Sequence, residues 1–213
     1  FTVETADEAL FLVKRYPALV VCKDQIRAAG NLIIESYKNN GQLLTCGNGG
    51  SCSDSDHIVG ELMKSFSKKR PLDKEVKEQL IAVDSEIGGV MAAKLEKGLA
   101  SISLNAHSAL ISAVANDIGG DFIFAQQIMG YGRKGDVLLG ISTSGNSKNV
   151  VNACIAAKAK SAKVIALVGE KGGNMKKYAD VAICVPSTCT PDIQEFHLPI
   201  YHALCIMAEE TFF

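Results

Sequence analysis

Short apolar runs separated by glycine-rich breaks dominate the chain from about residue 42 onward. Each run is rich in Val, Ile, Leu and Ala and shows little alternation, which is typical of a strand covered on both faces. Most of them end at glycine, serine, asparagine or proline. The five runs predicted to be strands are Gln42–Cys46, Leu99–Leu104, Asp136–Ile141, Lys163–Val168 and Val181–Val185.

Stretches of helical length lie between and after these runs. Strands that alternate with helices pair in parallel and form a sheet with helices on both faces. The pattern therefore predicts an α/β fold with a three-layer, doubly wound parallel sheet, whose ligands bind beyond the carboxyl ends of the strands. The helical stretches are 54–66, 108–131, 147–161, 173–179 and about 191–210.

The first 40 residues are predicted to form two helices. Thr5 and Glu8 fit a capping box that begins the first helix, and Pro17 interrupts it. A second helical pattern extends over about Ala18–Tyr37. Because residues 1–40 show no cluster of catalytic residue types, we interpret them as a packing or oligomer surface.

Residues 71–98 fit the alternating pattern least. They begin with a charged stretch and continue with a helical texture that contains Gly88 and Gly89. We interpret them as a solvated helical insertion, in preference to a lid over the substrate. Residues 1–213 are otherwise expected to form a single domain.

Composition limits the classes of partner. The 213 residues carry 47% hydrophobic and 21% charged residues with a formal net charge of −1, so there is no basic field for nucleic acid. No apolar run approaches the roughly 20 residues that cross a bilayer, and no signal-peptide pattern is visible. The seven cysteines contain no CxxC pair. We therefore expect a cytoplasmic protein with reduced thiols and no membrane or nucleic-acid partner.

Two loops, Gly47–Ser51 and Ser142–Ser147, each follow a predicted strand and begin a helix. Glycines let backbone amides approach an anion, hydroxyls add donors, and the helix N-terminus adds partial positive charge. A dinucleotide-binding loop is excluded because Cys52 stands where the third glycine is needed, and no Walker A loop is present. The loops therefore predict a phosphate site. The alternative is that Ser51 and Ser147 merely cap helices.

His57 and Glu61 are four residues apart and share one face of a predicted helix. The last helix contains Gln194, His197 and His202. Two histidines and a carboxylate can hold a divalent metal ion, and the same groups can transfer protons without one. The alternatives are a surface pair for His57 and Glu61 and a structural role for His197. Since Pro199 should kink this last helix, ideal geometry does not fix the spacing.

Four motifs together carry a resemblance to a known family. The chain resembles the sugar isomerase (SIS) domain family and, within it, the phosphoheptose isomerases. The motifs cover most of residues 40–210 apart from 71–98, and the long serine-rich run is the most specific. They are Cys46–Ser51 with Asp54, His57 and Glu61; Ala115–Asp117; Gly135–Ser147; and Ile193–Glu195 with His197 and His202.

The resemblance implies a five-stranded parallel sheet and a homotetramer with active sites at subunit interfaces. It implies interconversion of sedoheptulose 7-phosphate and D-glycero-D-manno-heptose 7-phosphate, with Glu61 and His202 as acid/base partners. Zinc is the implied cofactor, and its ligands are His57, Glu61, Gln194 and His202. The implied substrate-binding residues are Asn48, Gly49, Ser51, Asn116, Asp117, Ser142, Thr143, Ser144, Ser147 and Gln194.

Four departures from the family pattern leave the sugar open. Ser65 stands where relatives place a basic residue, and His107 stands where many carry a small polar residue. Thr190–Asp192 and the longer 71–98 stretch also differ. The alternatives are an isomerase of another sugar phosphate, and a non-catalytic SIS module that binds a protein partner, as the DnaA-binding initiator-associating protein does. The full set of chemically active side chains favours the enzyme.

Overall fold

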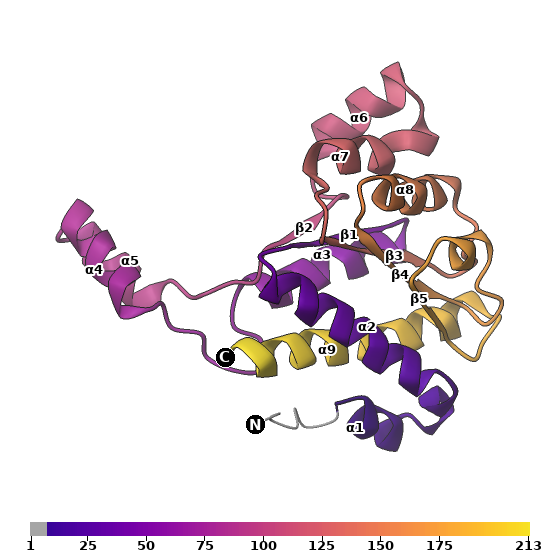
Figure 1. Ribbon diagram of the computed structural model, residues 1–213, viewed down its shortest axis with the longest axis horizontal. Helices are drawn as coiled ribbons and strands as arrows, with labels where there is room; N and C mark the ends of the chain where they lie inside the picture. The colour runs from indigo at the N-terminus through magenta and orange to yellow at the C-terminus, as the bar shows by residue number, and fades with distance from the viewer. Residues whose placement is uncertain (1–7) are drawn as a thin grey trace.

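A five-stranded, all-parallel sheet forms the centre of the computed structural model, which describes residues 8–213 (Figure 1). The strand order is β2-β1-β3-β4-β5. The predicted α/β fold is confirmed, and each strand begins and ends inside a predicted run or within one residue of it. The strands are β1 (Leu43–Gly47), β2 (Ser101–Ser103), β3 (Val137–Ser142), β4 (Lys163–Val168) and β5 (Val181–Cys184).

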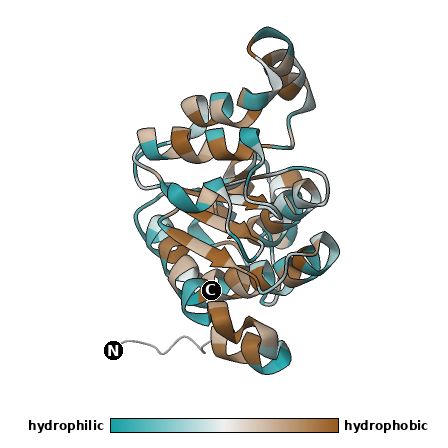
Figure 2. Ribbon diagram, turned by 90° about the vertical axis from the view of Figure 1, so that its right-hand side faces the viewer, coloured by the Kyte–Doolittle hydropathy of each residue, from teal (hydrophilic) through white to brown (hydrophobic). Residues whose placement is uncertain are grey.

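Helices cover both faces of the sheet. Leu139 and Ile141 of β3 pack into the core on one face, whereas Leu138 packs into the core on the other. The strands are accordingly mostly apolar (Figure 2), although β2 is Ser-Ile-Ser and β4 begins at the exposed Lys163. The first face is covered by α2 (Lys23–Lys38), α3 (Gly50–Met63) and α9 (Thr190–Phe212), with α1 (Glu8–Arg15) packed on α2 and α9. The second is covered by α7 (Ile123–Tyr131) and α8 (Lys148–Ala159), with α6 (Ser108–Asp117) packed on α7.

Short 3₁₀ turns interrupt the predicted helices. Pro17 begins η1 (Pro17–Cys22), which separates α1 from α2, and the predicted capping residue Thr5 lies outside the described residues. The single helix predicted over 108–131 is divided at Gly119, whose φ of +124° does not fit a helix. The two other turns are η2 (Gly120–Phe122) and η3 (Asn174–Lys177). Helix α9 continues through Pro199 without ending there.

Helices α4 (Lys74–Val83) and α5 (Ile87–Lys94) form a hairpin that projects from the body, which we call the arm (Figure 1). The two legs of the arm meet at its base, where Pro71 and Glu96 form an antiparallel bridge. Near its tip, Val83 is 89% exposed and Ile87 is 63% exposed. The arm therefore presents apolar side chains as well as the charged ones on which the solvated interpretation was based.

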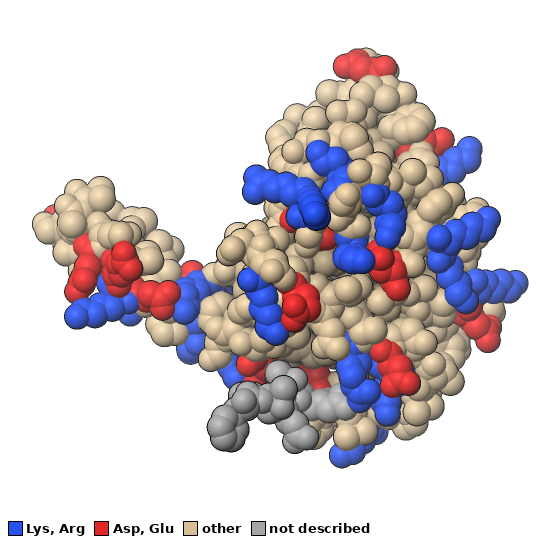
Figure 3. Space-filling view, in the orientation of Figure 1, with Lys and Arg blue, Asp and Glu red and all other residues tan. Residues whose placement is uncertain are grey.

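The surface shows charges of both signs. On the face seen in Figure 3, acidic side chains lie among the basic ones, in agreement with a net charge of −1. Between residues 8 and 213, no helix combines the length and the apolar character needed to cross a membrane.

Candidate active site

The two Gly/Ser loops leave neighbouring strands at the same edge of the sheet. The first loop follows β1 and the second follows β3, and these strands pair in parallel from Leu43↔Val137 to Gly47↔Ile141. The chain crosses from β1 to β2 on one side and returns to β3 on the other, so the strand order reverses between β1 and β3. Ligands of doubly wound sheets bind at this reversal, beyond the carboxyl ends of the strands.

The first loop leads directly into α3. Gly49 has a φ of +57°, which glycine adopts without strain. A Cβ atom on Gly50 would lie 2.5 Å from Nε2 of Gln194, so a larger residue here would displace the end of that side chain. Ser51 follows in the first turn of α3 and is 3% exposed. The N–H groups of Ser51 and Cys52 donate within the loop to the carbonyls of Asn48 and Gly49. The partial positive charge of the helix N-terminus lets this loop hold an anion.

The second loop brings three serine hydroxyls together at the N-terminus of α8. Ser142 Oγ lies 3.1 Å from Ser147 Oγ and 3.5 Å from Ser144 Oγ. The Ser147 side chain caps no N–H group of α8, and the N-cap of α3 is Gly49 rather than Ser51. Capping of α8 therefore does not explain these hydroxyls; Ser142 Oγ accepts from the N–H of Gly145 and Ser144 Oγ from the N–H of Asn146, and the three O–H groups can donate. Thr143 lies between them in the same loop.

A pair of amide side chains joins the two loops. Asn48 Nδ2 donates to Asn149 Oδ1 at 2.8 Å, and Asn149 Nδ2 donates back to Asn48 Oδ1 at 3.0 Å. Asn149 lies in the first turn of α8. The pair therefore fixes the N-termini of α3 and α8 relative to each other, and the loops form one site.

His57 lies in the middle of α3 within a chain of hydrogen bonds. Its Nε2 is 2.9 Å from Oε1 of Glu61, and its Nδ1 is 3.0 Å from the hydroxyl of Tyr201. Tyr201 donates its single proton to Asp54 at 3.3 Å. The tautomer of His57 decides which contact it donates to: a proton on Nδ1 is donated to the tyrosine oxygen, and a proton on Nε2 is donated to Glu61. This chain of contacts orients the imidazole toward the carboxylate.

His202 on α9 stands beside this pair. The centroids of the His57 and His202 rings are 5.2 Å apart. Burial, and then the neighbouring His57, lower the pKa of His202, which keeps its imidazole neutral and able to accept a proton. Its Nε2 is buried and has no hydrogen-bond partner among the described residues. A buried polar atom without a partner is costly, so this nitrogen is available to a ligand.

Gln194 lies with the Gly/Ser loops rather than with His57 and His202. Its side chain contacts Gly50, and it precedes His202 by eight residues on α9, about 12 Å at 1.5 Å per residue. The structure thus brings His57, Glu61 and His202 together but not the fourth predicted ligand. Within the described residues, no three His, Cys, Asp or Glu side chains converge closely enough to hold a metal ion.

Asn116 and Asp117, which were predicted to bind substrate, lie exposed at the end of α6. Asn116 Nδ2 donates to Asp117 Oδ1 at 2.8 Å, and no hydrogen bond among residues 8–213 links either side chain to the loops. His107, one of the departures from the family pattern, has a local role. Its Nδ1 accepts from the N–H of Leu110 at 3.2 Å and caps α6.

Three residues that the sequence analysis gave no role contribute to the site or its surroundings. Asn149 joins the loops, Tyr201 orients His57, and Arg70 contacts the end of α3. A signal was present for Tyr201, which adjoins His202, and for Asn149, which follows the serine-rich run. Arg70 ends a run of basic residues and gave no sign that it is buried.

The site can be compared with known proteins. The SIS domain family matches residues 20–79 and 81–169. A phosphoheptose isomerase of Nitratiruptor sp. is 39% identical over 187 residues, which are 88% of this chain and 86% of that protein. Phosphoheptose isomerase 2 of Campylobacter jejuni is 39% identical over 204 residues, with 91% and 89% covered.

A solved structure gives the same result. The phosphoheptose isomerase of Neisseria gonorrhoeae superposes with a TM-score of 0.74 at 32% identity, covering 95% of this chain and 93% of that one. The fold, the two loops and the sequence all match those of this family. The chain belongs to the phosphoheptose isomerases of the SIS domain family.

Proposed function

We propose that this protein is an aldose–ketose isomerase that interconverts sedoheptulose 7-phosphate and D-glycero-D-manno-heptose 7-phosphate. The observation that carries the proposal is the pairing of a hydroxyl-rich anion site at the sheet's reversal point with a His–Glu group that can transfer protons. The relatives are named phosphoheptose isomerases, in agreement with this chemistry. The thiols of all seven cysteines are free, which supports a cytosolic location.

In this proposal the two loops bind the phosphate. The hydroxyls donate to its oxygens, and the N-termini of α3 and α8 add backbone donors and partial positive charge. Asn48 and Gly49 shape the first loop, and Asn116 and Asp117 remain predicted contacts to the sugar. The residues proposed to grip the phosphate are Ser51, Ser142, Thr143, Ser144 and Ser147.

Glu61 and His202 are proposed to carry the proton transfers. One group removes the proton from the carbon next to the carbonyl, which gives an enediol, and the proton returns to the neighbouring carbon. The other group moves the hydroxyl proton between the two oxygens. The neutral imidazole of His202 suits either step, since it can accept a proton and then donate it.

We propose zinc as the cofactor, held by His57, Glu61, Gln194 and His202. Imidazole nitrogens and a carboxylate are ligands that zinc prefers, and the buried Nε2 of His202 lacks a partner among the described residues. When bound, zinc would polarise the carbonyl as a Lewis acid.

The spacing along the helices supports active sites that are shared between subunits of a homotetramer. Glu61 follows the start of α3 by eleven residues, about 16 Å at 1.5 Å per residue, so one chain holds its phosphate loops and its His–Glu group far apart. Gln194 and His202 are also about 12 Å apart along α9, and the Gln194 side chain lies beside Gly50. In the proposed tetramer, each active site would combine two chains. One chain would hold the phosphate with its loops, and the other would perform the proton transfers.

Turnover of purified protein with sedoheptulose 7-phosphate, with and without added zinc, tests the proposal. We expect D-glycero-D-manno-heptose 7-phosphate as the product, and a loss of kcat of about 10²- to 10⁴-fold in Glu61→Gln. Glu35→Gln, the same change at an exposed position of α2, is the matched control and should retain full activity.

The results separate the alternatives. Turnover of a pentose or hexose phosphate but not of the heptose would change the substrate and keep the reaction. No turnover of any sugar phosphate would refute the isomerase, and full activity of Glu61→Gln would refute the role of Glu61.

A further inference from the structure

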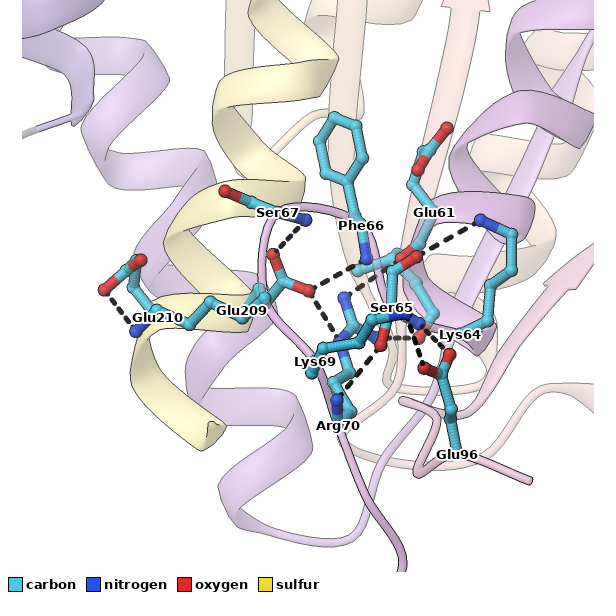
Figure 4. A network of polar contacts seen from close by, with 12 residues as sticks. Glu61, Lys64, Ser65, Phe66, Ser67, Lys69, Arg70, Glu96, Glu209 and Glu210 are labelled. Atoms are coloured by element: carbon cyan, nitrogen blue, oxygen red, sulfur yellow. Dashed lines mark hydrogen bonds and ion pairs between the residues drawn. The ribbon is translucent and has the colours of Figure 1, made fainter. Parts of the chain in front are cut away.

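A fully buried ion pair lies where the end of α3 meets the end of α9 (Figure 4). Arg70, in the segment after α3, donates from Nε to Oε1 of Glu209 at 2.7 Å, and both side chains are 0% exposed. Removing two charges from water costs more than the attraction between them returns unless further hydrogen bonds satisfy both groups. The remaining partners of the pair therefore indicate what it does.

The other N–H groups of the Arg70 guanidinium donate to the end of α3. Nη2 donates to the carbonyl of Glu61 at 3.0 Å, and Nη1 donates to the carbonyl of Leu62 at 2.7 Å. The last carbonyls of a helix have no partner inside the helix, and a cation there also interacts favourably with the helix dipole. One face of the guanidinium lies 4.8 Å from the ring centroid of Phe213. Arg70 thus caps α3 at the residue proposed to transfer protons.

Glu209 is equally well supplied with donors. It accepts from the N–H groups of Phe66 at 3.0 Å and Ser67 at 2.7 Å, in addition to Arg70. Burial by itself raises the pKa of Glu209, but these donors outweigh burial and lower it, so the carboxylate stays charged. Glu209 lies seven residues after His202, about two turns further along the same side of α9.

We infer that Arg70 and Glu209 are positioning residues that hold the backbone of Glu61 on α3 against the helix that carries His202. This inference rests on the proposed function, because it concerns the two groups assigned to proton transfer. Neither residue touches substrate in this role. The pair acts by fixing the separation of α3 and α9, and a displacement of about 1 Å between reacting groups lowers rates by up to about 100-fold.

A neighbouring ion pair provides a matched control. Lys68 and Glu210 join the same two segments, but their side chains are 37% and 32% exposed, and neither contacts α3 by a hydrogen bond. Figure 4 shows Glu210 on the side of α9 away from Glu61. Lys68→Met therefore removes an ion pair from the same place without removing a cap from α3.

The test separates positioning from stability. Arg70→Met alone leaves Glu209 charged and unpaired, and this variant should be strongly destabilised. The double variant Arg70→Met/Glu209→Gln leaves no buried charge, and its amide oxygen still accepts from the segment after α3. We expect its Tm to recover toward wild type while kcat stays about 10- to 100-fold low and KM for the sugar phosphate stays unchanged, because the phosphate loops are untouched.

Recovery of both Tm and kcat in the double variant would refute the inference, since the pair would then serve stability alone. Lys68→Met should retain kcat and KM, and an equal loss of kcat there would also refute it. If the double variant fails to fold, Arg70→Lys decides. It keeps the charge beside Glu209 but reaches fewer carbonyls, so an intermediate kcat supports positioning and a wild-type kcat refutes it.

Failure of the proposed function would show separately as an inactive wild type. In that case, NMR of histidine-labelled protein can monitor the contact between the rings of His57 and His202. This measurement tests positioning without turnover. Loss of that contact in the double variant but not in Lys68→Met supports the inference, and its retention in both refutes it.

Discussion

His197 lies on α9 between Gln194 and His202, and it is 0% exposed. Burial lowers its pKa from 6.5 to about 4, so the imidazole is neutral in the folded protein at neutral pH. The unfolded chain binds a proton below pH 6.5 that the folded chain does not bind until about pH 4. The folded state is therefore not penalised above pH 6.5, and it loses stability as the pH falls from 6.5 to 4.

This difference predicts a measurable pH dependence. Between pH 6.5 and 4, His197 should cost the folded state about 3 kcal/mol, and replacing it with Leu should make the free energy of unfolding less dependent on pH by that amount. Urea unfolding at several pH values measures the slope. Leu198→Ala changes an exposed residue of the same helix and removes no titratable group, so its slope should match wild type. Parallel slopes for His197→Leu and wild type would contradict the prediction.

At the residue scale, local chemistry was predictable and long-range contacts were not. Ser142 and Ser147 could be assigned from their position between a strand and a helix. The partner of Arg70 lies 139 residues further along the chain, and a basic residue after two lysines looks like part of a solvated surface. The resemblance grouped Gln194 with His202 as zinc ligands, and the structure places them about two turns of α9 apart.

The loops between elements depend on glycines at a few positions. Gly145 has a φ of +65°, and a Cβ atom there would meet the carbonyl oxygen of Gly172 in the loop after β4 at 2.2 Å. The second phosphate loop is therefore packed directly against that neighbouring loop, and any side chain would separate them.

We expect Gly145→Ala to cost about 1–3 kcal/mol of folding free energy and to abolish phosphate binding. Thermal unfolding with and without inorganic phosphate measures both effects, because a bound ligand raises Tm. Gly130, on an exposed turn of α7 with no atom near its Cβ position, offers a control. Gly130→Ala should leave the phosphate effect intact, and a phosphate-dependent Tm in Gly145→Ala would disprove the expectation.

Strands were the elements most accurately predicted, because fully buried parallel strands are continuous apolar runs with clear ends. The helices were predicted in type but less well in extent. Residues 108–131 have a continuous apolar texture, yet Gly119 adopts a conformation that ends α6. The separation of η1 from α2 depends on packing, which a pattern along the chain does not contain.

At the scale of the whole molecule, the proposed sharing of active sites predicts complementation between inactive variants. Glu61→Gln lacks the acid/base group, and Ser144→Ala lacks part of the phosphate grip. In mixed oligomers, some sites combine an intact Glu61 from one chain with intact loops from another. Co-expression with two different tags and purification by both should therefore restore a fraction of the wild-type activity.

The matched control combines two changes in the same half of the site. Ser144→Ala and Ser147→Ala both damage the loops, so no mixture of them forms an intact site and activity should stay low. Mixed oligomers of Glu61→Gln and Ser144→Ala that are as inactive as either parent would show that each chain builds its own site.

The base of the arm has a consequence for how this family can vary in length. The crossover from β1 to β2 is long, but the Pro71–Glu96 bridge and a 2.7 Å bond from the N–H of Lys97 to the carbonyl of Arg70 close it before the arm begins. These contacts already hold the two ends of the arm together. Doubling the length of a flexible loop adds only about 0.6 kcal/mol to the free-energy cost of closing it. Insertions and deletions in the arm therefore leave the sheet and the capped end of α3 almost undisturbed, so evolution can remodel this segment separately from the chemistry.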